Sequence, residues 1–162
     1  KNGTRTAIYC GYGGRCLMSV RTKSHPKFRS KFEQSISDYL TKKGYKFEYE
    51  SRKTRFRKPV QGGICEDCSS TSVSKRAIYL CDFIVGGRPI YLEAKGRFLS
   101  ADRTKILSVL NTSSEIDRSN FRLLFMRDNW TTKAGKERYT DWCKRHSIKC
   151  AVWPNIPRGF LK

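Results

Sequence analysis

The sequence has no long apolar run. No stretch approaches the roughly 20 apolar residues that a membrane-spanning helix needs, and the first residues lack the apolar core of a secretory signal. We therefore expect a soluble protein that works inside the cell, in the cytoplasm. With 162 residues, of which 38% are hydrophobic, the chain is long enough to bury one core, so we expect a single globular domain.

Acidic residues are scarce. The chain has 14 Asp and Glu against 34 Lys and Arg, which gives a formal net charge of +20. Such an excess repels itself unless a polyanion or counterions neutralise it, and this favours nucleic acid as the partner. A soluble basic protein, a membrane-surface binder or a structural coat on nucleic acid would carry similar charge, so charge alone does not choose among them.

Histidine is almost absent. His25 and His146 stand far apart, and neither belongs to a metal-binding spacing such as H-x-x-H, so we interpret both as structural. The seven cysteines are an odd number without the spacing of a small disulfide scaffold. They favour reduced thiols or metal ligands, and hence a reducing compartment.

One cysteine pair has the spacing of half a zinc site. Cys65 and Cys68 form a C-x-x-C pair, and Cys10 and Cys16 lie in the basic N-terminal segment. Four thiolates from these residues would bind a structural zinc ion and fix the N-terminal segment to the insertion. Free surface thiols, or a pair completed by a partner subunit, are the alternatives. Cys143 and Cys150 are expected in the core.

The chain divides into a short arm and one domain. Residues 1–26 hold several cations, no acid and a glycine-rich run, which favours a basic N-terminal arm, possibly part of the zinc-bound element. Residues 27–162 form the main domain, which contains a basic connector and the Cys-containing insertion at residues 52–76. Apolar periodicity predicts helices over 28–40, 102–110 and 139–146, and strands over 45–49, 77–85, 90–95, 121–126 and 148–153.

These elements predict a mixed α/β (α+β) fold. A first helix begins near Ser24 to Pro26, where a helix start signal stands, and it ends at Gly44. The strands 77–85 and 90–95 are joined by the hairpin signal at residues 86–89. We find no internal repeat, and the order α, β, β, β, α, β, α, β indicates one central mixed β-sheet flanked by helices.

Three charges interrupt the two apolar hairpin strands. Asp82 lies in the first strand, and Glu93 and Lys95 share one face of the second because strand side chains alternate. An ionised group in an apolar strand costs free energy unless it has a partner. Two nearby carboxylates are commonly neutralised by a divalent cation, which indicates Mg²⁺, with Mn²⁺ as a substitute. A cross-strand salt bridge from Lys95 to Glu93 or Asp82 is the structural alternative.

The hairpin with Asp82 and Glu93-Ala94-Lys95 resembles the PD-(D/E)XK nuclease superfamily, whose pattern is weakly specific by itself. More of the chain resembles the phage endonuclease I family, in collinear order over roughly residues 27–153. The segments that carry this resemblance are residues 28–33 (FRSKFE), 46–50 (KFEYE), 81–83 (CDF), 93–96 (EAKG), 102–103 (DR) and 142–149 (WCKRHSIK).

The resemblance implies an enzyme that hydrolyses phosphodiester bonds in branched or four-way DNA junctions, on a restriction-endonuclease-like core. It implies that Glu33, Asp82 and Glu93 bind the metal and that Lys95 is the catalytic lysine. It also implies an intertwined, domain-swapped homodimer in which Glu33 acts in the partner's site, inside a phage-infected bacterial host. Cys81 stands where the family usually has proline, and we interpret it as a buried structural thiol.

The substrate has two further interpretations. The extra cysteine element and basic arm would suit a sequence-specific, homing-type endonuclease on the same frame, and a non-catalytic DNA-binding module is the other alternative. We expect neither a membrane nor a small-molecule partner. Basic residues beside the catalytic elements and in the connector are the candidates for phosphate contact. They are Lys27, Arg29, Lys31, Arg55, Arg57, Lys58, Arg97, Arg103 and Lys105.

Overall fold

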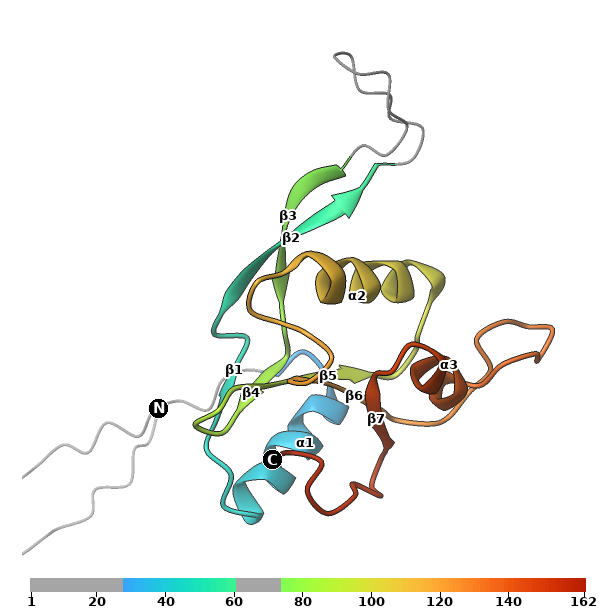
Figure 1. The fold of residues 1–162 in the computed structure, drawn as a ribbon. Helices are drawn as coiled ribbons and strands as arrows, with labels where there is room; N and C mark the ends of the chain where they lie inside the picture. Colours follow the sequence, from blue (N-terminus) through green and yellow to red (C-terminus); the bar gives the residue numbers. More distant parts are fainter. Residues whose placement is uncertain (1–27, 61–73) are drawn as a thin grey trace, which may run out of the picture.

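A five-stranded mixed sheet forms the centre of the protein. The computed structural model describes residues 28–60 and 74–162, and Figure 1 shows their arrangement. The sheet has the strand order β1-β4-β5-β6-β7. Its members are β1 (Phe47–Tyr49), β4 (Phe83–Val85), β5 (Ile90–Lys95), β6 (Phe121–Phe125) and β7 (Lys149–Val152). The predicted mixed α/β fold with a central sheet is confirmed.

Helix α1 (Lys31–Lys42) begins later than the sequence indicates. The predicted start at Ser24 to Pro26 is wrong, because Phe28 to Ser30 are not helical in the structure. Ser30 is the N-cap instead, and its hydroxyl accepts a hydrogen bond of 3.2 Å from the Glu33 amide. The predicted stop is confirmed, since the helix ends before Gly44, which has a positive φ of 73°.

The hairpin of β4 and β5 is confirmed, with Phe83 opposite Leu92 and Val85 opposite Ile90. The single strand predicted over 77–85 is wrong, however. It divides into β3 (Ser74–Leu80) and β4, which belong to different sheets. An apolar run predicts extended chain but not its pairing partner. The division falls at Cys81 and Asp82.

Helices cover both faces of the sheet. Strands β5, β6 and β7 are parallel, and α2 (Ser100–Thr112) and α3 (Tyr139–Arg145) connect them. Both helices pack in one hydrophobic core, whereas α1 and the C-terminal residues pack in the other, on the opposite face (Figure 1). Each apolar strand is therefore buried on two faces, which explains its continuous hydrophobic run. No helix in the described residues is long and apolar enough to cross a membrane.

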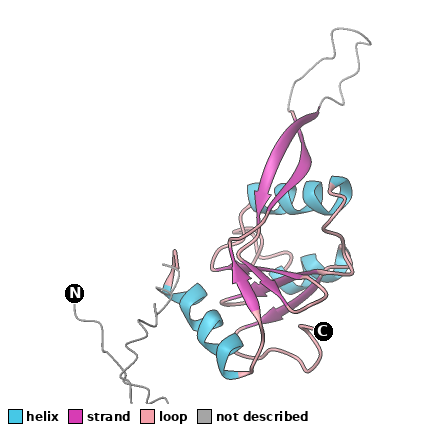
Figure 2. Cartoon of the chain, turned by 90° about the vertical axis from the view of Figure 1, so that its left-hand side faces the viewer, coloured by secondary structure: helices cyan, strands magenta, loops and turns pink. Residues whose placement is uncertain are grey.

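A two-stranded arm rises from the sheet beside α2 (Figure 2). It consists of β2 (Lys53–Pro59) and β3, paired antiparallel from Lys53 opposite Leu80 to Pro59 opposite Ser74. The basic connector predicted at the start of residues 52–76 is therefore a strand from Lys53 to Pro59. Thr54 and Phe56 of β2 are buried, while the intervening cations are exposed. This alternation fixes one face of the arm against the protein.

Candidate active site

Asp82 lies where the chain passes from the arm to the central sheet. Its Oδ2 atom accepts a hydrogen bond of 2.8 Å from the backbone amide of Ala94 in β5, and no donor in the described residues reaches its Oδ1 atom. Burial, followed by the negative charge of Glu93, raises the pKa of Asp82 to about 7. The site thus holds a carboxylate that a nearby cation would stabilise.

Glu93 is the most deeply buried acid of the site, with 4% of its surface exposed. The Tyr79 hydroxyl donates a hydrogen bond of 2.6 Å to its Oε2 atom, and the Lys95 ammonium lies 2.8 Å from its Oε1 atom. Both oxygens therefore have a partner, as a buried carboxylate requires. Sequence reasoning missed Tyr79, because a tyrosine in an apolar strand has no signal that separates it from the core.

Lys95 lies between two carboxylates. Besides Glu93, its Nζ atom is 3.3 Å from Oδ1 of Asp102 at the start of α2. The other Asp102 oxygen accepts a hydrogen bond of 3.0 Å from the Leu99 amide. Burial opposes the charged form of Lys95, but Glu93 and Asp102 outweigh it and raise its pKa, so the side chain is an ammonium at neutral pH. The Lys95–Glu93 pair of the structural alternative is present, but it lies within β5 and does not cross between strands.

Glu33 lies on the first turn of α1, and its position differs from that of the other three. The Tyr49 hydroxyl donates to its Oε2 atom at 2.6 Å, and the Ser30 hydroxyl donates to its Oε1 atom at 2.9 Å. It is near enough for its negative charge to raise the pKa of Asp82. Helix α1 packs on the sheet of its own chain here, so the structure shows no exchange between subunits.

The acids suit a hard divalent cation. Among the described residues, no three acidic, histidine or cysteine side chains form a ready metal cluster. Magnesium, however, commonly takes one or two carboxylates and completes its shell with water and substrate phosphate. Asp82 and Glu93 provide such a pair, and a carboxylate has about four lone-pair sites, so Glu93 can accept a cation beside its present partners. The donor set therefore fits Mg²⁺.

The predictions for the cysteines have different outcomes. Cys10, Cys16, Cys65 and Cys68 lie outside the described residues, so zinc binding stays a prediction. Burial raises the pKa of Cys81 well above its ordinary value, which keeps it a protonated thiol and a poor metal ligand.

The core prediction holds for the other two cysteines. Cys143 is buried, and Cys150 is partly buried and packs against the same hydrophobic core.

The residues predicted to contact phosphate fall into two groups, those whose side chain already has a hydrogen-bond or ion-pair partner among the described residues and those whose side chain does not. Arg29 is paired with Glu50 at 2.9 Å, and Arg103 donates to the carbonyl oxygens of Phe98 and Thr131, so these two cations already have protein partners. Lys27 lies outside the described residues. Of the remaining candidates, Lys105 is partly buried. The others are exposed, namely Lys31, Arg55, Arg57, Lys58 and Arg97.

Asp82 immediately precedes β4 and lies beside Glu93 and Lys95 of the neighbouring strand β5, so the structure brings together the residues for which the sequence resembles a nuclease. A model of the phage endonuclease I family matches residues 15–162. The chain is 30% identical over 153 residues to Endonuclease I of Escherichia phage T7, covering 94% of this chain and 87% of the phage protein.

A second relative agrees. Endodeoxyribonuclease 1 of Enterobacteria phage T3 is 30% identical over 122 residues, which are 75% of this chain and 68% of that protein. The chain therefore belongs to the phage endonuclease I family and is, by homology, an endodeoxyribonuclease. This membership favours the enzyme over the non-catalytic DNA-binding module.

Proposed function

We propose that this endonuclease cuts four-way DNA junctions with a divalent metal, Mg²⁺ or Mn²⁺, held by Asp82 and Glu93. The observation that carries the proposal is the convergence of a buried acid, a partly buried acid and one ammonium at the β4–β5 hairpin. A bound metal would supply Lewis acidity toward a phosphate oxygen and a water molecule. Asp82 supports this assignment because burial and the charge of Glu93 raise its pKa to about 7 although Lys95 lowers it, so a bound cation would stabilise its charged form.

Lys95 acts as a cation and hydrogen-bond donor in this proposal. Its raised pKa keeps the ammonium charged, so it offsets the charge that develops on the attacked phosphate and does not remove a proton. Glu93 and Asp102 hold its Nζ atom from two sides. Tyr79 fixes the Glu93 carboxylate by its hydrogen bond, so the catalytic groups are oriented before the substrate arrives.

Glu33 is the fourth member of the proposed site and its third acid. Its negative charge acts on Asp82 from α1, and Tyr49 and Ser30 hold its carboxylate. We propose that it acts across an intertwined homodimer, in which α1 and β1 make their present sheet contacts with the partner subunit. Two sites on one dimer would then cut two strands of a junction.

Subunit mixing tests this arrangement. A chain carrying Glu33→Gln is combined with one carrying Glu93→Gln, after refolding them together, and cleavage is measured. If Glu33 acts in trans, half of the sites in a mixed dimer contain both wild-type residues, so nicking activity returns. If every site remains inactive although mixed dimers are detected by mass, the exchange proposal is wrong.

Substrate choice is tested with matched DNA. An immobile four-way junction, a nicked duplex, a branched duplex and a linear duplex library are incubated with Mg²⁺ side by side, with Asp82→Asn as the inactive control. We expect junction cleavage that does not depend on sequence. One recurrent cut in linear duplex, with no preference for the junction, would instead support the sequence-specific alternative.

A further inference from the structure

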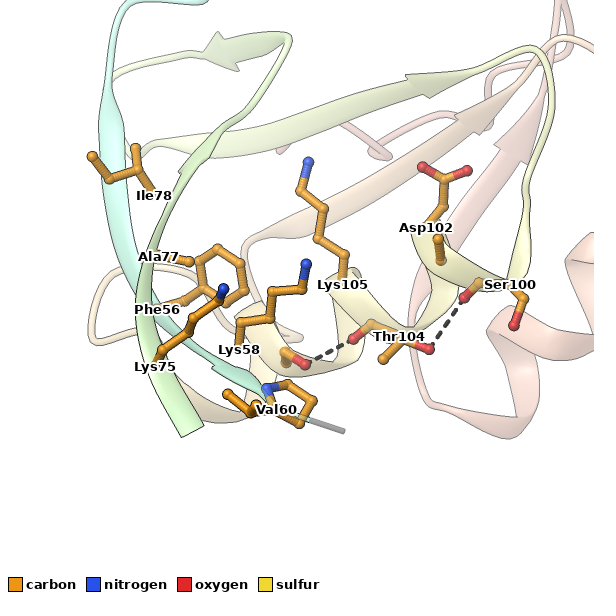
Figure 3. Close-up of a pocket in the computed structure, with 13 residues that line it drawn as sticks. Phe56, Lys58, Val60, Lys75, Ala77, Ile78, Ser100, Asp102, Thr104 and Lys105 are labelled. Carbon is orange, nitrogen blue, oxygen red and sulfur yellow. Dashed lines mark hydrogen bonds between the residues drawn. The ribbon is translucent and has the colours of Figure 1, made fainter. Parts of the chain in front are cut away.

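A groove of about 810 Å³ separates the arm from helix α2. Figure 3 shows side chains from both elements along it. On the helix wall, Asp102 and Lys105 are accompanied by four small side chains, Ser100, Ala101, Thr104 and Ser108. The hydroxyls of Thr104 and Ser108 donate to carbonyl oxygens one turn earlier in the helix, at 3.2 and 2.8 Å. The helix therefore does not fill the space beside the arm.

The groove is strongly cationic. Lys58 and Lys75 lie directly opposite each other on β2 and β3, and Lys105 joins them from α2 (Figure 3). None of the three forms an ion pair with another described residue. Like charges at opposed strand positions destabilise a hairpin. The acidic residue of the lining, Asp102, is already engaged by Lys95 at 3.3 Å.

The arm is attached to the rest of the protein, so the groove is formed in advance. The backbone amide of Arg57 donates a hydrogen bond of 2.8 Å to the Thr112 hydroxyl at the end of α2. The Thr54 hydroxyl donates to Glu115 at 3.3 Å. Phe56 is buried in the core shared with α2. Little ordering is then needed when a ligand enters.

One side chain connects the groove to the acids. The Lys105 ammonium lies 4.9 Å from the centroid of the Tyr79 ring, and the hydroxyl of the same tyrosine donates to Glu93. Asp102 lines the groove and contacts Lys95. The Tyr79 ring therefore lies between Lys105 and the Glu93 carboxylate.

We propose that this groove binds the phosphodiester backbone of the DNA strand that continues beyond the cleaved phosphate, with Lys58, Lys75 and Lys105 as phosphate contacts. The proposal rests on the proposed function, since it places the reacting phosphate at Asp82 and Glu93. A polyanion suits the groove because it relieves the repulsion between Lys58 and Lys75. It also explains why two lysines face each other across the arm.

Salt dependence of binding tests the proposal. The groove variant carries Lys58→Gln, Lys75→Gln and Lys105→Gln, and the control variant carries Lys42→Gln, Lys144→Gln and Lys162→Gln, which are exposed and lie elsewhere. Affinity for a fluorescent four-way junction is measured by anisotropy in EDTA over a range of salt concentrations. Three lost contacts at about 0.9 each should reduce the slope of log K against log salt by about 2.7. The control should keep nearly the wild-type slope.

Uncharged phosphate analogues in the DNA identify the positions that the groove lysines contact. Methylphosphonates are placed one at a time along the strand beside the cut site. At one or more positions they should weaken binding by the wild type and the control variant, but not by the groove variant. Single substitutions, each expected to reduce the slope by about 0.9, keep the test open if the triple variant folds poorly.

The outcomes separate the two proposals. If the wild type cuts DNA and the groove and control variants have equal slopes, the groove proposal is overturned and the proposed function stands. The same conclusion follows if no methylphosphonate position depends on the groove lysines. A wild type that neither binds nor cuts DNA overturns both.

Discussion

The charged side chains of the proposed catalytic centre have protein partners, whereas the lysines of the arm do not have ion-pair partners among the described residues. In the centre, Glu93 and Lys95 are buried or partly buried and each has protein partners. Along the arm, Lys58 and Lys75 face each other without an ion pair to a described residue. The centre is organised by the protein itself, whereas the arm is completed by its ligand. Substitutions in the centre should therefore affect chemistry and stability, and those on the arm should affect binding.

Glu93→Gln should produce the largest effect. It removes a negative charge that both Lys95 and the proposed metal need, so we expect cleavage to fall by about 10³-fold or more, which corresponds to about 4 kcal/mol. Single-turnover cleavage of a four-way junction measures it. Glu48→Gln, at an exposed position of β1, is the matched control and should stay within a few fold. Equal activity of the two variants would remove Glu93 from the site.

Asp82→Asn should stabilise the metal-free protein at neutral pH. Folding raises the pKa of Asp82 from 3.8 to about 7, so the folded state binds the proton more tightly than the unfolded state. The contribution of Asp82 to stability is therefore fully present at low pH and is lost as pH rises from about 4 to about 7. The variant lacks this loss, and its advantage above pH 7 should be on the order of 1–3 kcal/mol.

Urea unfolding in EDTA at several pH values measures that difference. Asp38→Asn, at an exposed position of α1, is the control, and its difference from the wild type should not vary comparably with pH. If the advantage of Asp82→Asn is the same at pH 4 and pH 8, burial and charge at Asp82 are not as described.

Tyr79→Phe should have the next largest effect, a loss of stability. It removes the hydroxyl that donates to the buried Glu93 oxygen at 2.6 Å, and leaving a buried acceptor unsatisfied costs about 1–3 kcal/mol. Urea unfolding at pH 8 gives the value. Tyr45→Phe is the control, because its hydroxyl makes no hydrogen bond to a described residue. A difference below about 0.5 kcal/mol would show that Glu93 does not depend on this contact.

Arg57→Gln should have the smallest effect. Arg57 is exposed on the outer face of the arm, and its backbone, rather than its side chain, contacts Thr112. Stability should change by less than about 0.5 kcal/mol, while the salt slope of junction binding should fall by about 0.9. An unchanged slope in an anisotropy titration would exclude a phosphate contact at this position.

The sequence predicts the centre better than the arm because their signals differ. The sequence reveals the centre because a charge in an apolar strand costs free energy unless it has a partner, and this makes Asp82, Glu93 and Lys95 recognisable. In β2 the signal is weak, because Thr54 and Phe56 alternate with so many cations that the segment looks like an irregular connector. Strand pairing is not encoded locally either. The run 77–85 therefore gave one strand where the structure has two.

Partners of the catalytic residues were also beyond sequence reasoning. Tyr79 is distant from Glu93 in the chain and resembles any core tyrosine, yet its hydroxyl is what the carboxylate contacts. Asp102 was recognised only as part of a family motif, and its contact with Lys95 depends on how α2 meets β5. Such contacts come from tertiary packing, which period and composition do not contain.

The most direct test of the central claim is metal binding by the free protein. Calorimetric titration with Mn²⁺ at pH 8 is compared for the wild type, Asp82→Asn, Glu93→Gln and the control Glu48→Gln. We predict that the wild type and the control bind with similar affinity and that both site variants lose at least about tenfold, equivalent to about 1.4 kcal/mol. Equal affinity in all four proteins would contradict the assignment of Asp82 and Glu93 as metal ligands.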